Sequence, residues 1–210
     1  ILYNNEYINF MNFNYLENSY ALYAELKNKF GKLSTTVGLR MEDINYESFI
    51  EESNFKIDKH LNNFFPTLHL LFEINKDVNV VASYTKKVSM PPYSQLDPNN
   101  NGYFDIYNSS IGNQFLEPNF YNNYSFKITA FNWVQLGTDY SNSKNVGLMT
   151  YIAEPNSLNT SQTYRTYDKI KYLSVYASIP IPFGLISKGK SFFDQPLDLD
   201  KMSGLLIYAS

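Results

Sequence analysis

The chain has 210 residues and a net charge of −3, and 17% of its residues are aromatic. It contains no cysteine, which excludes a disulfide scaffold and a cysteine-ligated metal site. The slightly acidic balance argues against a nucleic-acid-binding protein, which normally presents a basic surface.

Apolar and polar residues alternate with a period of two along most of the chain, which predicts β-strands. In the segment 33–42, Leu33, Val37 and Leu39 share one face, while Arg40 and Glu42 lie on the other. We count about eight strands by this test and find no helical stripe. The clearest segments, in chain order, are 19–26, 33–42, 64–74, 78–87, 124–129 and 172–179.

The connections between the predicted strands alternate in length. We expect tight turns at 30–32, 75–77 and 130–133, and long polar links at 45–63, 88–119 and 142–168. Outer-membrane barrels show this alternation, because their periplasmic turns are short and their extracellular loops long. The expected fold is therefore all-β: an antiparallel transmembrane β-barrel, here a partial barrel of about eight meandering strands with alternating short turns and long loops.

Several motifs appear in a fixed order along the chain. A strand ending in Ser83–Lys87 leads to the proline-containing loop Met90–Pro92, and Gly112–Pro118 then enters the next strand. The run Gly38–Glu42 lies two strands earlier. This layout resembles the barrel of TonB-dependent outer-membrane receptors, and the loops rich in Asn, Tyr and Lys are similar to the Bacteroidetes branch of that family. Gln114 departs from the family pattern, which usually has proline there.

The resemblance implies a location and a function. Residues 1–210 would be a β-barrel segment of a receptor in the Gram-negative outer membrane, with the plug domain and the final strands outside this chain. The receptor would take up a scarce nutrient, such as an iron chelate, cobalamin, a glycan or a peptide. The implied partners are outer-membrane lipid, TonB through an upstream segment not in this chain, a surface lipoprotein and the nutrient, but no nucleic acid.

Candidate site residues fall into two groups. The polar face of the strands is expected to line the barrel lumen, and it carries Arg40, Glu42, His69 and Glu73. The links 45–63 and 88–119 are expected to contribute to the binding mouth, where the aromatic residues of 88–119 either stack on a ligand or pack the loops together. The ligand-binding candidates in this link are Tyr93, Gln95, Asp97, Tyr103, Phe104 and Tyr107.

Other kinds of site have little support in the sequence. The two histidines, His60 and His69, have no further ligands at a spacing that suggests a metal site. No nucleophile elbow or phosphate-binding glycine loop is present, so we expect neither an enzyme nor a cofactor. The pair Lys86–Lys87 is expected to contact lipid headgroups or a loop.

Two other architectures fit the alternation. A small, closed eight-stranded barrel with a structural or adhesion role would pair residues 1–13 with residues 202–210. A soluble β-sandwich binding module also alternates, because one face of each sheet packs on the core and the other meets water.

Overall fold

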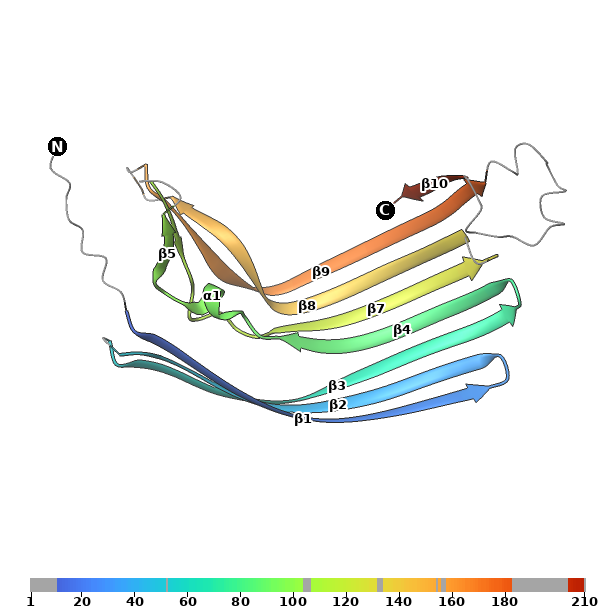
Figure 1. Cartoon of the computed structure of the whole chain (residues 1–210), viewed down its shortest axis with the longest axis horizontal. Coiled ribbons are helices and arrows are strands. Elements are labelled where there is room, and N and C mark those ends of the chain that lie inside the picture. Colours follow the sequence, from blue (N-terminus) through green and yellow to red (C-terminus); the bar gives the residue numbers. More distant parts are fainter. Residues whose placement is uncertain are drawn as a thin grey trace.

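The computed structural model describes residues 11–51, 53–103, 107–131, 134–153, 155, 158–182 and 204–209. These residues form one curved sheet of ten strands in the order β1-β2-β3-β4-β7-β8-β9-β6-β5, with β10 also paired to β9 (Figure 1). The long strands are β1 (Phe13–Phe30), β2 (Leu33–Ile50), β3 (Phe55–Asn75), β4 (Val78–Ser89), β7 (Asn119–Ala130), β8 (Val134–Ala153) and β9 (Thr160–Pro182). The short elements are α1 (Tyr93–Leu96), β5 (Asn100–Tyr103), β6 (Asn108–Ile111) and β10 (Gly204–Ala209).

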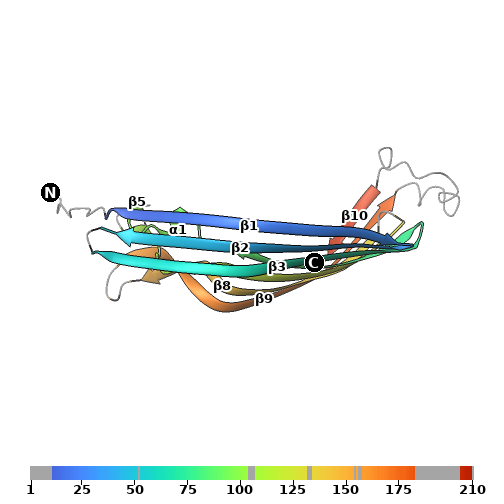
Figure 2. The same ribbon diagram turned by 90° about the horizontal axis from the view of Figure 1, so that it is seen from below.

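Consecutive long strands pair antiparallel with their neighbours, and they run along most of the length of the molecule (Figure 2). At one end, which we call the short-turn end, the chain reverses tightly. Gly31 takes a positive φ of 58° between β1 and β2, and the Asn75 side chain accepts hydrogen bonds from the backbone N–H groups of Asp77 and Val78. The opposite end, which we call the long-loop end, carries the segment between β4 and β7. The predicted all-β architecture is confirmed.

Two of the three predicted long links are wrong in extent. The strand β2 continues to Ile50 and β3 begins at Phe55, so most of 45–63 is a hydrogen-bonded hairpin. In the same way β8 reaches Ala153 and β9 begins at Thr160, so most of 142–168 is strand. Alternation disappears there because both faces become polar or partly covered, while the backbone ladder continues unchanged. Only 88–119 is mainly a connection.

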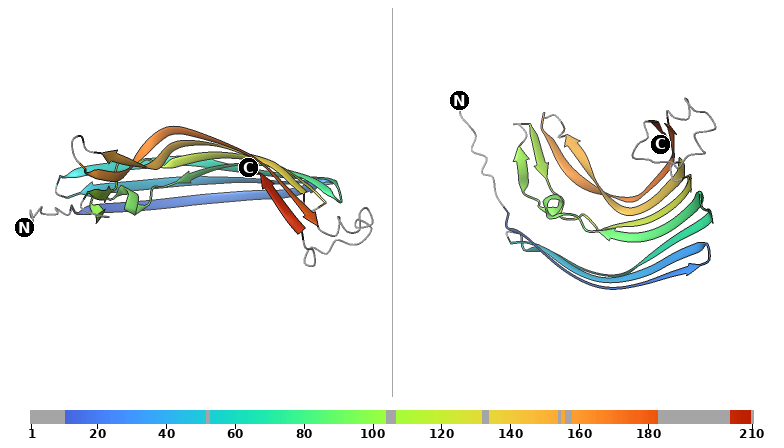
Figure 3. Two further views of the ribbon diagram at one scale, coloured as in Figure 1. Left: turned by 90° about the horizontal axis from the view of Figure 1, so that it is seen from above. Right: turned by 45° about the vertical axis from the view of Figure 1, so that its right-hand side comes forward.

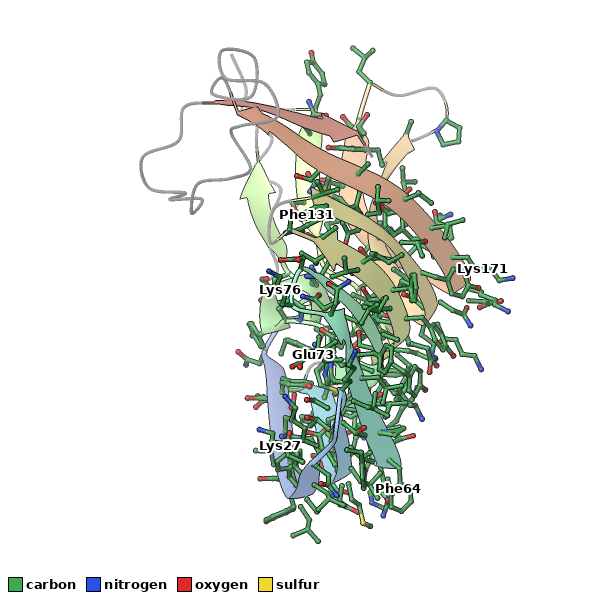
Figure 4. All side chains as sticks on the ribbon, turned by 90° about the vertical axis from the view of Figure 1, so that its right-hand side faces the viewer. Lys27, Phe64, Glu73, Lys76, Phe131 and Lys171 are labelled. Atoms are coloured by element: carbon green, nitrogen blue, oxygen red, sulfur yellow. The ribbon has the colours of Figure 1, made fainter. Side chains whose placement is uncertain are left out.

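The register assigns side chains to two faces, because directly paired residues of adjacent strands lie on the same face. We call the convex face outer and the concave face inner; Figure 4 labels Phe64 and Lys171 on the outer side, and Lys27 and Glu73 on the inner side. The outer face is apolar across the sheet, and many of its side chains are exposed, including Leu22, Leu26, Val37, Leu39, Phe72, Phe126, Leu136 and Val175. Exposed apolar surface on this scale requires an apolar surrounding.

The apolar band has a sharp edge toward the long-loop end. Tyr84, Tyr124 and Tyr140 stand side by side on β4, β7 and β8, with ring centroids 4.9 Å and 5.9 Å apart. On β2 the outer face changes from Met41 to Asp43, which lies 2.7 Å from His60 Nε2. The apolar run Leu33–Met41 has the length of about 9–11 residues that a tilted membrane strand needs. Tyrosine belts of this kind mark membrane–water interfaces.

At the long-loop end of the inner face, Phe13, Ile50, Leu96 and Leu116 form a small buried apolar cluster. Among the described residues, the only helix is the four-residue α1, and none is long and apolar enough to cross a membrane.

The two alternative architectures do not match the described part of the chain. A β-sandwich needs two facing sheets, but these residues form one. A small closed barrel would pair residues 1–13 with 202–210. Residues 1–10 lie outside the described part. Within it, β1 pairs only with β2 and β10 pairs only with β9, so these residues contain no pair that closes a small barrel.

Candidate functional site

The described residues of the segment 90–118, which we call the inner loop, fold onto the inner face at the long-loop end (Figure 3). Its start is a single turn of helix, in which the Asp97 N–H donates to the Tyr93 carbonyl at 2.9 Å. The end of the loop returns to this turn: the Gly112 N–H donates to the Asp97 carbonyl at 3.0 Å, and the Asn113 N–H to the Gln95 carbonyl at 2.6 Å. The approach requires glycine, because a Cβ at Gly112 would lie 2.3 Å from the Asp97 carbonyl oxygen.

Hydrogen bonds and apolar contacts tie the inner loop to the sheet. The Asn99 amide bonds both backbone groups of Met11, accepting from its N–H at 2.8 Å and donating to its carbonyl at 2.9 Å. The Asn113 side chain donates to the Tyr164 carbonyl at 2.8 Å. Leu96 and Leu116 enter the buried cluster described above. The loop is therefore a fixed part of the inner wall.

A cavity of about 190 Å³ lies between the inner loop and the sheet. Its lining combines apolar side chains with amide, carboxylate and hydroxyl groups. Its lining residues are Ser89, Met90, Pro91, Pro92, Gln95, Leu116, Glu117, Asn119, Tyr121 and Gly147.

Asn119 differs from the other lining residues because it is a buried amide with one oxygen that lacks a partner among the described residues. It is only 9% exposed, and its Nδ2 donates to the Tyr121 hydroxyl at 2.7 Å. Its Oδ1 has no hydrogen-bond partner within the described part of the chain. A buried acceptor without a partner costs free energy, so it calls for a donor, which an ordered water or a bound molecule can supply. Glu117 beside it forms an ion pair with Lys59 at 3.2 Å and accepts a hydrogen bond from Asn145 Nδ2 at 2.8 Å.

The predicted ligand-binding residues are not equivalent in the structure. Gln95 lines the cavity. Asp97 is 8% exposed and binds the N–H and Nδ2 of Asn99, so its carboxylate is used to shape the loop. The Tyr93 ring packs 5.5 Å from the Phe13 ring, and its hydroxyl donates to the Phe13 carbonyl at 3.2 Å.

The remaining candidates from this loop lie elsewhere. Tyr107 is half exposed, and its carbonyl accepts the Thr160 N–H at 2.7 Å, which joins the loop to β9. Tyr103 belongs to β5, and Phe104 lies outside the described residues.

The four residues predicted to face the lumen all lie on the inner face, but they do not form one site. The Arg40 Nε donates to Glu42 at 2.8 Å, and the two side chains form an ion pair on β2. Glu73 is at the short-turn end, 3.1 Å from the Lys29 amine. His69 stands between them, opposite Thr36 and Ser83.

Asn119 and Tyr121 were missed by the sequence analysis. Both belong to the stretch that follows the Gly112–Pro118 motif, where the sequence indicated only the entry of a strand. The two side chains line the cavity because the inner loop folds back over them. The alternation of β7 alone does not predict this tertiary contact.

Burial also changes the acidity of nearby tyrosines. Desolvation, with a further contribution from the Glu117 charge, raises the pKa of Tyr46 to about 12. Burial and the neighbouring Asp97 raise the pKa of Tyr93. Both phenols therefore stay neutral at ordinary pH. Within the described residues, no group of three or more His, Asp or Glu side chains is arranged to hold a metal ion.

Residues 3–193 match the model of the outer membrane protein beta-barrel family. The chain belongs to this family. The protein is therefore located in the outer membrane, as the alternating faces and connections predicted. Since turns of outer-membrane barrels are short on the periplasmic side, the short-turn end faces the periplasm and the long-loop end the cell exterior. No curated protein matches this sequence.

Solved outer-membrane receptors have a similar fold. The hemophore receptor HasR of Serratia marcescens, solved as a double mutant with its hemophore HasA and heme, gives a TM-score of 0.55 at 12% identity over 78% of this chain and 32% of that one. The siderophore receptor PirA of Pseudomonas aeruginosa gives 0.46 at 16% identity, over 80% of this chain and 40% of that one. The alcaligin receptor FauA of Bordetella pertussis gives 0.45 at 17% identity, over 79% and 28%.

Of these three, only HasR exceeds a TM-score of 0.5, and at this identity the likeness concerns the fold alone. The chain spans less than half the length of each receptor. The resemblance to the barrel of TonB-dependent receptors is thus confirmed for the fold, while the Bacteroidetes branch stays a prediction.

Proposed function

We propose that this chain forms part of the wall and mouth of an outer-membrane receptor that takes up a scarce nutrient with energy supplied through TonB. The observation that carries the proposal is the inner loop, which is fixed against the inner face at the extracellular end and encloses a small cavity with a buried, unpartnered acceptor on Asn119. A purely structural wall gains nothing from such an acceptor, because it lowers stability.

The chemistry of the cavity favours an uncharged polar group next to an apolar one. Asn119 Oδ1 would accept a hydrogen bond from a ligand N–H or O–H, and Met90 and Leu116 would contact carbon atoms beside it. At about 190 Å³ the cavity holds only part of a drug-sized ligand, which needs about 300–1,000 Å³. The rest of the ligand would be held by other loops of the receptor.

The test is growth of a Gram-negative host that lacks the gene and is complemented with the full-length protein. Media limited in turn for iron chelate, cobalamin, glycan or peptide identify the nutrient, and a protonophore tests whether uptake needs the proton gradient. The variant Asn119→Leu should weaken uptake of that nutrient at least about fivefold, because a lost ligand hydrogen bond in a buried site costs about 1–3 kcal/mol. The variant Val88→Ala, on the outer face of the same barrel end, is the matched control.

A host without the gene that grows normally in all four media would contradict the receptor function. We also propose that the protein performs no covalent chemistry. Incubation of the purified protein with glycan and peptide substrates should give no turnover, and measured hydrolysis would overturn this part of the proposal.

A further inference from the structure

The lysine residues in the described part of the chain differ in whether they have an acidic partner. At the periplasmic side of the inner face and along the β2–β3 hairpin, lysines have acidic partners: Lys27 pairs with Glu25, Lys29 with Glu73, Lys56 with Glu47, and Lys59 with Glu117. The other described lysines have no ion pair with an acid. Of these, Lys32 and Lys76 lie at the short-turn end, and Lys87 and Lys127 lie on the inner face. The remaining four form the second set: Lys86, Lys144, Lys169 and Lys171.

The register brings this second set together on the outer face. Lys86 of β4, Asn122 of β7, Asn142 of β8 and Lys171 of β9 form one row across four strands, since each is the direct partner of the next. Lys144 and Lys169 form the next row toward the extracellular end. Residues from four separate parts of the sequence thereby build one basic patch. Figure 4 shows Lys171 projecting from the convex side.

The basic patch lies just above the extracellular edge of the apolar band. The row directly below it is Tyr84, Tyr124, Tyr140 and Leu173, which is the extracellular edge of the apolar band. The Tyr84 hydroxyl donates to Asn122 at 3.0 Å, so the two rows are also linked by a hydrogen bond. Lipid headgroups lie at this level, just outside the acyl-chain region.

The charge arrangement is unfavourable unless an anion is present. Lys144 and Lys169 are direct cross-strand partners, and like charges placed directly opposite each other destabilise a sheet. The acids nearest in sequence or pairing, Asp139 and Asp168, alternate onto the other face and do not offset them. A bound anion between these lysines would remove the repulsion.

A groove lies at one end of the patch. The pairing of β3 with β4 ends at Thr67–Thr85, next to Pro66, which cannot donate a ladder hydrogen bond, whereas the pairing of β2 with β3 passes Pro66 without interruption. The two strands separate above this point and leave a groove of about 680 Å³. Its lining includes the aromatic side chains of Phe64, Tyr84 and Phe120. Its two lysines are Lys144 and Lys86, and the Lys86 amine lies 5.7 Å from the centroid of the Phe65 ring, between the two faces of the sheet.

We propose that this groove and the adjoining lysine rows bind the phosphorylated headgroup of a lipid of the outer leaflet. Phosphate supplies the negative charge that the lysines lack, and amide side chains such as Asn122 suit the hydroxyl groups of a glycolipid. A lipid is favoured over free phosphate because the groove opens on the lipid-facing surface immediately above the apolar band, where the acyl chains would lie. The site is on the opposite face from the Asn119 cavity and does not depend on the nutrient.

The experiment measures lipid binding to the full-length protein, purified from outer membranes in detergent, by native mass spectrometry. The probes are lipid A with both phosphates, the same lipid after enzymatic dephosphorylation, and inorganic phosphate alone. One variant replaces Lys86, Lys144, Lys169 and Lys171 with Gln. The matched control replaces the acid-paired Lys27, Lys29, Lys56 and Lys59 with Gln, so that both variants lose the same charge.

The expected result is binding of phosphorylated lipid A that weakens at least about tenfold in the first variant and less than about threefold in the control, because each lysine near an anionic lipid surface contributes a several-fold factor. Added salt should weaken binding to the wild type and have less effect on the first variant. Equal binding of the dephosphorylated lipid, equal losses in both variants, or equally tight binding of inorganic phosphate would each overturn the proposal.

Discussion

At the scale of single residues, Tyr46 offers a direct test of the packing at the extracellular end. Its side chain is 7% exposed, and its hydroxyl has no hydrogen-bond partner among the described residues. Tyr46→Phe removes an unsatisfied buried group and keeps the ring, so we expect the free energy of unfolding to stay the same or rise by up to about 1 kcal/mol. Denaturant unfolding in detergent micelles measures this change.

The matched control is Tyr84→Phe, which removes a hydroxyl that donates to Asn122. This variant should lose about 0.5–1.5 kcal/mol of stability. If Tyr46→Phe is destabilised as much as Tyr84→Phe, the Tyr46 hydroxyl has a partner and the packing described for it is wrong.

The same residue gives a pH dependence with a definite sign. Burial raises the pKa of Tyr46 from 10.0 to about 12, so the folded state holds this proton more tightly than the unfolded state. The contribution to stability is complete below pH 10 and is lost as the pH rises toward 12. The fall in stability over this range should be smaller for Tyr46→Phe. An identical fall in both proteins would show that Tyr46 ionises like an exposed tyrosine.

Individual residues also show what a single sequence can and cannot predict. The alternation assigns Val37 and Leu39 to the apolar face, and the register agrees. It cannot place Lys86 near Lys171, because that neighbourhood depends on the pairing of four strands. It cannot identify Asn119 as buried either, since the covering loop comes from tertiary packing.

At the scale of elements, the inner loop depends on the close backbone approach at Gly112. A Cβ there would overlap the Asp97 carbonyl carbon and oxygen, which are backbone atoms that cannot turn aside. Gly112→Ala should therefore displace α1 from β6. We expect a loss of about 1–3 kcal/mol, the usual effect of overpacking, together with loss of nutrient uptake.

Gly147→Ala is the control for this change, because a Cβ at Gly147 would meet only Leu116 side-chain carbons at 3.6 Å and 4.0 Å. Limited proteolysis within the inner loop, compared for the two variants, reports whether the loop has moved. Equal resistance to protease in both would contradict the clamp formed by the Gly112 and Asp97 backbones.

The sequence predicts the strands correctly in the part of the sheet that crosses the membrane. Alternation located the strands across the apolar band, since lipid on one side and water on the other force a period of two. Above the band, β2 and β8 continue as strands although Asp43 and Asn142 now stand on their outer faces, and the sequence there reads as a polar link. The four-residue α1 is too short to show a helical period at all.

At the scale of the whole molecule, the assignment of the outer face to lipid is the statement on which the others rest. Val37 lies at the middle of the apolar run Leu33–Met41, with Leu26 and Leu68 beside it on the neighbouring strands. Its neighbour Thr36 lies on the inner face, between Lys27 and His69. The two positions are at nearly the same depth and differ mainly in what surrounds them.

A charge at these two positions should therefore have unequal effects. Val37→Arg places a cation at the centre of the hydrocarbon layer and should cost about 2–4 kcal/mol, whereas Thr36→Arg enters a polar lumen and should cost less than about 1 kcal/mol. Unfolding of the full-length protein in lipid vesicles and its level in the outer membrane measure both effects. Equal costs would mean that water reaches both faces at this depth. The sheet would then not stand in the bilayer with its convex side outward, and the lipid-binding patch above Tyr84 would lose its basis as well.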